Sequence, residues 1–115
     1  MTGVLGREGE RLAAEHLESL GYRVVARNVR LGRGGEIDII AKHGATIVFV
    51  EVKARASRSF GAAVAAVDAR KRARLRRLAE EWLQTAAPNA YARFDVITIE
   101  RLGTRTMVRH LEGAF

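Results

Sequence analysis

The chain has 115 residues, a formal net charge of +7 and no cysteine. This length predicts a single domain, residues 1–115, and the lack of cysteine excludes disulfides, thiolate metal sites and a cysteine nucleophile. No segment has the apolar core of a secretory signal, and no apolar run approaches the roughly 20 residues of a membrane span. We therefore expect a cytoplasmic protein that does not enter membranes. Basic domains of this size often bind nucleic acid.

The first half of the chain predicts one helix followed by three strands. Residues 6–22 carry apolar side chains on one stripe at helical spacing, and Gly21 is a suitable terminator. Residues 22–28 predict a strand, and residues 29–35 form a glycine-rich loop. Two further strands are predicted at 36–41 and 46–55, and the short segment between them favours a hairpin.

The second half predicts a long helix and two more strands. The helix spans roughly residues 68–86, with Asp68 as its N-cap, and strands follow at 93–100 and 104–112. The strand–helix–strand passage through this helix indicates a parallel crossover. The predicted fold class is therefore α/β, a mixed β-sheet flanked by helices in the order αβββαββ.

Charged residues interrupt the otherwise apolar hairpin strands. Alternation along a strand puts Glu36 and Asp38 on one face, and Glu51 and Lys53 on one face. A turn of two residues at 43–44, or of four at 42–45, would place Asp38 opposite Phe49 and Glu36 opposite Glu51. Asp38 and Glu51 would then be diagonal neighbours, about 7–8 Å apart at the backbone.

Such clustered carboxylates must take up protons or hold a cation. Oxygen ligands without cysteine or histidine suit Mg²⁺ or Mn²⁺, and Lys53 beside them suits a phosphate. The pattern predicts a site for metal-dependent phosphodiester hydrolysis. The alternative is an exposed hairpin end that carries ordinary surface ion pairs.

These residues carry a resemblance to a known family. Asp38 followed by Glu51-Val52-Lys53 resembles the D…(D/E)xK signature of the PD-(D/E)xK nuclease superfamily. The segments "GREGERLAAEHLESLGYRVVARN", "GGEIDIIA", "FVEVKAR", "FGAAVAAVDARKRARL" and "RFDVITI" together resemble the YraN-like family of predicted endonucleases, which is related to archaeal Holliday junction resolvases. The resemblance covers nearly the whole chain.

The resemblance implies a restriction-endonuclease-like core and Mg²⁺- or Mn²⁺-dependent chemistry on DNA, including branched or junction DNA. It assigns Asp38, Glu51 and the Val52 carbonyl as metal ligands, and Lys53 as the catalytic lysine. It also places the acidic side chain of Glu10 near the metal. A symmetric homodimer is implied as well. Ile37 stands where the superfamily name has proline, and Glu36 is a secondary candidate for the site.

Basic residues supply candidates for DNA binding. Lys71 falls on the inward stripe of the long helix, where a phosphate contact or a snorkelling side chain would explain it, and the resembled family also carries a lysine there. Arginines close to the predicted carboxylate site, in sequence or by strand pairing, are further candidates for phosphate contacts: Arg27, Arg30, Arg33, Arg55 and Arg58.

Three functions remain open from the sequence: a metal-dependent DNA endonuclease, a non-cutting nucleic-acid-binding module on the same fold, and a basic protein-interaction domain. The Asp38, Glu51 and Lys53 set favours the first, because carboxylates repel phosphates unless a cation lies between them. Outside this set, we expect Asp95 to form an ion pair with Arg93. The three histidines show no metal-ligand spacing.

Overall fold

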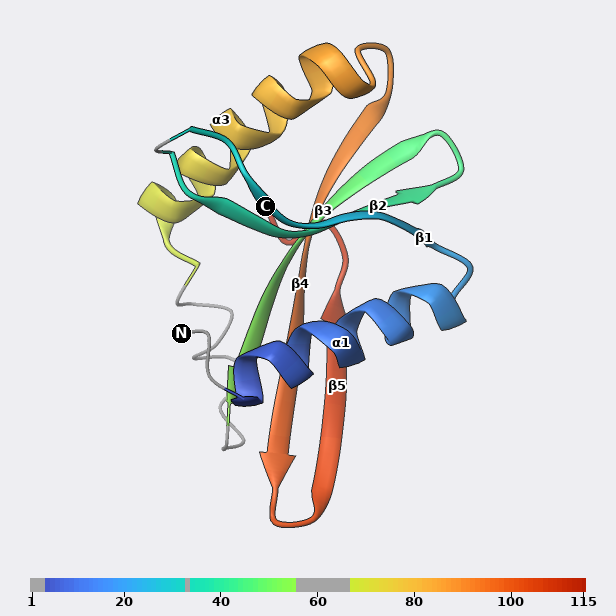
Figure 1. Ribbon diagram of the computed structural model, residues 1–115, viewed down its shortest axis with the longest axis vertical. Helices are drawn as coiled ribbons and strands as arrows, with labels where there is room; N and C mark the ends of the chain where they lie inside the picture. Colours follow the sequence, from blue (N-terminus) through green and yellow to red (C-terminus); the bar gives the residue numbers. More distant parts are fainter. Residues whose placement is uncertain (1–3, 33, 56–66) are drawn as a thin grey trace.

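The computed structural model describes residues 4–32, 34–55 and 67–115, except for the side chains of residues 4, 5 and 55. The predicted order of elements and the mixed α/β class are confirmed (Figure 1). The elements are α1 (Val4–Ser19), β1 (Arg23–Arg30), β2 (Glu36–His43), β3 (Thr46–Arg55), α3 (Ala69–Ala86), β4 (Tyr91–Leu102) and β5 (Arg105–Leu111). Of the described helices, neither is long and apolar enough to cross a membrane.

The strands form one five-stranded sheet in the order β1-β2-β3-β4-β5. Neighbouring strands are antiparallel except for β3 and β4, which are parallel and joined through α3. The predicted crossover is therefore confirmed. Asp68 caps α3, since its carboxylate accepts a hydrogen bond of 3.0 Å from the backbone N–H of Lys71.

The two described helices cover opposite faces of the sheet, and side chains that alternate along β3 pack against one or the other. Val48 and Val50 pack with Leu17 of α1, in a core that extends to Val52 and Ala54. Phe49 faces the other way and packs with α3 in a second core. Figure 1 shows α3 beside one end of the sheet and α1 across the other, so the β4–β5 hairpin extends beyond α3.

The β2–β3 hairpin turns at Gly44-Ala45, one residue later than the predicted two-residue turn. Gly44 has a φ of 61°, the left-handed conformation that glycine adopts without strain. Ile40 pairs with Phe49 and Ile39 with Val50, so the predicted register is wrong by two residues. Because an even shift preserves the face of every side chain, Asp38 still shares a face with Glu51. Extending the ladder by one residue puts the two directly opposite.

The alternation in β1 breaks at Asn28, which has a φ of 53° although it is not a glycine. Arg27 and Asn28 are both exposed in succession. On either side of this break, Ala26 and Val29 pack into the same α3-side core. Their partners Ile40 and Ile37 on β2 do likewise, whereas strict alternation would separate them. Asn28 lies level with Asp38, and β1 and β2 remain paired beyond it, through Val29 with Ile37 and Arg30 with Glu36.

Candidate metal centre

Three carboxylates converge where α1 meets the start of β2. Oxygen atoms of Glu10, Glu36 and Asp38 all lie within 4.8 Å of one another, and each side chain is half-buried. Ligand oxygens around one Mg²⁺, each about 2.1 Å from the ion, are separated by about 3–4 Å. The group therefore has the donor type that a hard divalent cation prefers, and a spacing within a small adjustment of coordination.

Asp38 is held in place by the neighbouring strand. The backbone N–H of Val52 donates to its Oδ2 at 2.9 Å. Burial raises the pKa of Asp38 to about 7, and the negative charges of Glu51 and Glu10 add to that effect. The Val52 hydrogen bond opposes the shift only in part. A bound cation would favour the ionised form of this carboxyl group.

Glycine at position 9 brings Glu10 to the sheet. A Cβ atom on Gly9 would lie 2.9 Å from the Cβ of Ala54 and 3.6 Å from Cγ1 of Ile99. Contacts under 3 Å force some displacement, so only glycine permits this approach of α1 to β3 and β4. The following residue is Glu10, whose side chain is thereby directed at Asp38.

A pair of glycines, Gly34 and Gly35, precedes Glu36 and sets its position. A Cβ on Gly34 would lie 2.9 Å from Cδ2 of Leu78, and one on Gly35 would lie 3.5 Å from Nε of Arg74. Gly35 also has a φ of +115°, which side chains rarely tolerate. The loop before β2 therefore lies directly on α3 and enters the strand at Glu36.

Two lysines hold the fourth carboxylate. Glu51 is only 6% exposed, and its Oε2 is bonded by the ammonium of Lys71 and lies 3.5 Å from Nζ of Lys53. Burial disfavours the charge on Lys71, but the hydrogen bond to Glu51 and the nearby carboxylates outweigh it and raise the pKa of Lys71. Burial and the neighbouring Lys71 lower the pKa of Lys53. The lysine pair is thus unequal, with Lys53 the weaker base.

The structure places the predicted site residues in two neighbouring groups. Glu10, Glu36 and Asp38 form one group, while Glu51, Lys53 and Lys71 form a second group beside it. The structure links Val52 to Asp38 through its N–H. Of the arginines, Arg30 is 80% exposed with its Nε 3.6 Å from Glu36, and Arg27 is exposed on β1. Arg33, Arg58 and the side chain of Arg55 lie outside the described residues.

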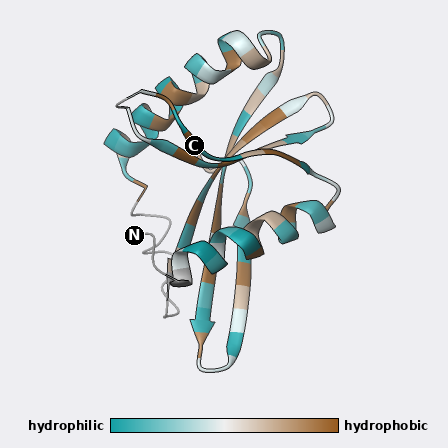
Figure 2. Cartoon of the chain, in the orientation of Figure 1, coloured by the Kyte–Doolittle hydropathy of each residue, from teal (hydrophilic) through white to brown (hydrophobic). Residues whose placement is uncertain are grey.

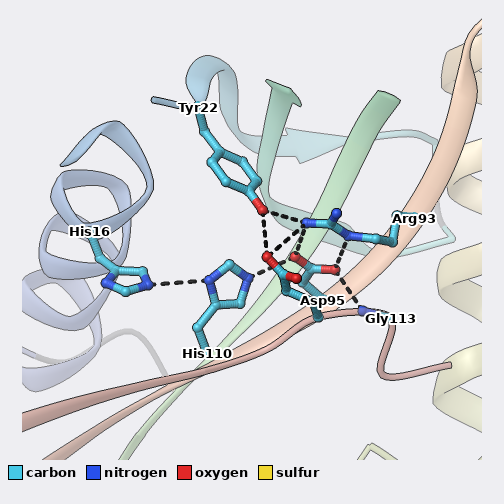
Figure 3. A network of polar contacts seen from close by, with 7 residues as sticks. His16, Tyr22, Arg93, Asp95, His110 and Gly113 are labelled. Atoms are coloured by element: carbon cyan, nitrogen blue, oxygen red, sulfur yellow. Dashed lines mark hydrogen bonds and ion pairs between the residues drawn. The ribbon is translucent and has the colours of Figure 1, made fainter. Parts of the chain in front are cut away.

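A second polar cluster joins α1, β4 and β5 on the α1 side of the sheet (Figure 3). Asp95 is fully buried and accepts hydrogen bonds from Arg93, His110 and the backbone N–H of Gly113. The His110 ring in turn lies 3.2 Å from His16. The predicted ion pair of Asp95 with Arg93 is confirmed, with N–O distances of 2.9 Å.

These contacts were only partly foreseen, because histidines 94 residues apart in the chain meet across the fold. Tyr22 closes the cluster: its hydroxyl accepts from Arg93 and donates to Glu112 at 2.9 Å. Both carboxylate oxygens of Asp95 and both ring nitrogens of His110 have protein partners that explain their burial. We interpret it as a structural clasp rather than a reactive site.

Comparison with known proteins gives a consistent family. A family model described as "Uncharacterised protein family UPF0102" matches residues 9–99. A UPF0102 protein of Parafrankia sp. (strain EAN1pec) is 50% identical over 114 residues, covering 96% of this chain and 95% of that protein. One from Geobacter metallireducens is 45% identical over 112 residues, covering 96% and 91%. One from Streptomyces coelicolor is 48% identical over 99 residues, covering 84% and 76%.

Proposed function

The chain belongs to the UPF0102 family, and we propose that it is a Mg²⁺- or Mn²⁺-dependent endonuclease that hydrolyses phosphodiester bonds in DNA. The observation that carries the proposal is the meeting of Glu10, Glu36 and Asp38 within 4.8 Å, with Lys53 and Lys71 next to them. An acidic group beside amines, half-buried on a basic domain, suits a phosphate whose charge is bridged by a cation.

The D…(D/E)xK resemblance supports the same reading. Asp38 ends up level with Glu51, and Lys53 follows Glu51 on the same face of β3, as the signature of the PD-(D/E)xK superfamily requires. The element order αβββαββ agrees with the restriction-endonuclease-like core that the resemblance implies. We infer that Glu10, Glu36 and Asp38 hold the ion and that Glu51 completes the set, together with the Val52 carbonyl.

When bound, the ion would polarise a phosphoryl oxygen and lower the pKa of a coordinated water. Hydrogen bonds within the chain hold the side chains of this site in position. The Val52 N–H fixes the rotamer of Asp38, and Lys71 fixes the carboxylate of Glu51. Lys53 has a lowered pKa and a side chain that is 24% exposed, so its amine can orient a water or stabilise negative charge on the phosphate.

A cleavage panel tests the proposal. Linear, flapped and four-way DNA would be incubated with Mn²⁺, with Mg²⁺ and with EDTA. We expect strand scission only with a divalent ion, and a loss of at least about 10²-fold for Asp38→Asn and for Lys53→Ala. Asp68→Asn is the matched control, since it removes the same charge from an exposed N-cap that asparagine also fills.

The metal itself gives a second readout. Titration of Mn²⁺, followed by its paramagnetic resonance signal, should show a bound ion in the parent and in Asp68→Asn, and weakened binding in Asp38→Asn. If Asp38→Asn cuts DNA and binds Mn²⁺ like its control, the assignment of the site is wrong. DNA binding without scission by the parent under all ions would instead favour the non-cutting binding module.

A further inference from the structure

A recess opens on the β4–β5 hairpin, away from the carboxylates of Glu10, Glu36 and Asp38. It has a volume of about 400 Å³, within the roughly 300–1,000 Å³ common for ligand sites. Both strands are hydrophilic towards the free end of this hairpin (Figure 2). The residues that line the recess were given no role by the sequence: Glu100, Leu102, Arg105, Thr106, Met107 and Arg109.

The strand register places this recess on the same face of the sheet as Glu51 and Lys53. Lys53 of β3 pairs with Thr98 of β4, which pairs with Arg109 of β5. Directly paired residues point to the same face, so the three side chains form a row across the sheet. Two strand spacings of about 4.8 Å put Arg109 about 10 Å from Lys53 at the backbone.

Beyond Val96, the residues of β4 on the α3 side of the sheet are polar. The last β4 residue in the α3-side core is Val96, and Thr98 and Glu100 continue the same face beyond it. Both are buried, at 0% and 2% exposure, and neither the Thr98 hydroxyl nor the Glu100 carboxylate has a hydrogen-bond partner among the described residues. Buried polar groups without partners are rare and call for an explanation.

The guanidinium group of Arg109 explains how the buried carboxylate of Glu100 is accommodated. Nε of Arg109 lies 3.1 Å from Oε1 of Glu100 and forms an ion pair with it. The carboxylate lies beneath, shielded from solvent, while the Arg109 side chain is 46% exposed. Arg105 is also exposed on the rim. The recess therefore presents two guanidinium groups outward and keeps its one negative charge below them.

We propose that this recess binds a backbone phosphate of the DNA strand, with Arg105 and Arg109 as its contacts and Glu100 as the residue that positions Arg109. The inference rests on the proposed function, and it sets the path of the strand from Lys53 across β4 to β5. Guanidinium forks match phosphate oxygens. A fork already held by a buried carboxylate loses less freedom on binding than a free one.

Salt dependence of binding tests the contacts without any cleavage. Affinity for a fluorescent 20-nucleotide single strand would be measured by anisotropy in EDTA, from 50 to 200 mM NaCl. Each lost phosphate contact lowers the slope of log affinity against log salt by about 0.7 for single strands. We expect this loss for Arg105→Ala and for Arg109→Ala. Arg23→Ala, an exposed arginine at the other end of the sheet, should leave the slope unchanged.

Glu100→Gln separates positioning from overall charge, because the two effects have opposite signs. Removal of a negative charge alone would tighten DNA binding. If Glu100 positions Arg109, the variant should instead lower the slope by about 0.7, as Arg109→Ala does. Melting curves would check that the isosteric variant folds; the two exposed arginine variants carry the test if it does not.

The outcomes separate this site from the proposed hydrolysis. Slopes that match the parent in both arginine variants would overturn the phosphate site, whatever the cleavage panel shows. Tighter binding by Glu100→Gln with an unchanged slope would overturn its positioning role. Altered slopes in a protein that never cuts DNA would leave this site standing and remove the hydrolase.

Discussion

Replacement of Gly9 by alanine should destabilise the protein, against the trend for helices. Gly9 lies inside α1, where alanine would stabilise an isolated helix by about 1 kcal/mol. The added methyl group would, however, lie 2.9 Å from the Cβ of Ala54, and such overpacking costs about 1–3 kcal/mol. The expected net change is a loss of up to about 2 kcal/mol in the free energy of unfolding, or up to about 8 °C in Tm.

The assay is urea unfolding followed by circular dichroism, in a double-mutant cycle with Ala54→Gly. Removal of the opposing methyl group should relieve the contact, so the two substitutions should couple by about 1–2 kcal/mol. Mn²⁺ binding should also weaken in Gly9→Ala, because α1 and Glu10 must move outward. A Gly9→Ala protein that is about 1 kcal/mol more stable than the parent, with no coupling, would refute the close approach.

Three further predictions concern the polar contacts. Lys71→Ala should lower the free energy of unfolding in urea by about 1–3 kcal/mol, less than the roughly 3–5 kcal/mol typical of a broken buried ion pair. The loss is smaller because Glu51 keeps Lys53 at 3.5 Å. An unchanged free energy of unfolding would mean that the Lys71 side chain only snorkels. Burial and the nearby His110 lower the pKa of His16 below 6.5, so the folded state disfavours the protonated ring. The contribution of His16 to stability should therefore be complete above pH 6.5 and fall as the pH is lowered. A Tm that does not change with pH, or that falls equally in His16→Gln, would contradict this. Tyr22→Phe should cost about 1–2 kcal/mol by removing the acceptor of Arg93, and unaltered unfolding would show that water replaces it.

The sequence was sufficient for the elements and for most of the acidic site. Alternation along β2 and β3 predicted that Asp38 and Glu51 share a face, and this holds although the register is shifted by two residues. The error arose at the turn, because Gly44 could be its first or its second residue. The even length of the shift is what preserved the prediction.

Other parts of the site depend on contacts that periodicity does not encode. The meeting of Glu36 with Glu10 and Asp38 depends on the close approach of α1 to the sheet at Gly9 and on the packing of Gly34 and Gly35 against α3. Lys71 was predicted to point inward, but its partner Glu51 lies 20 residues earlier in the chain. The histidine clasp was missed for the same reason: His16 and His110 become neighbours only through the packing of α1 on the sheet.

The candidate metal centre draws its side chains from α1, β2, β3 and α3. No contiguous piece of the chain contains all of them without also containing most of the sheet. Reactivity towards DNA would therefore be a property of the completed tertiary structure, absent from nascent or partly folded chains. Loss of scission and loss of global structure should then occur at one and the same denaturant concentration.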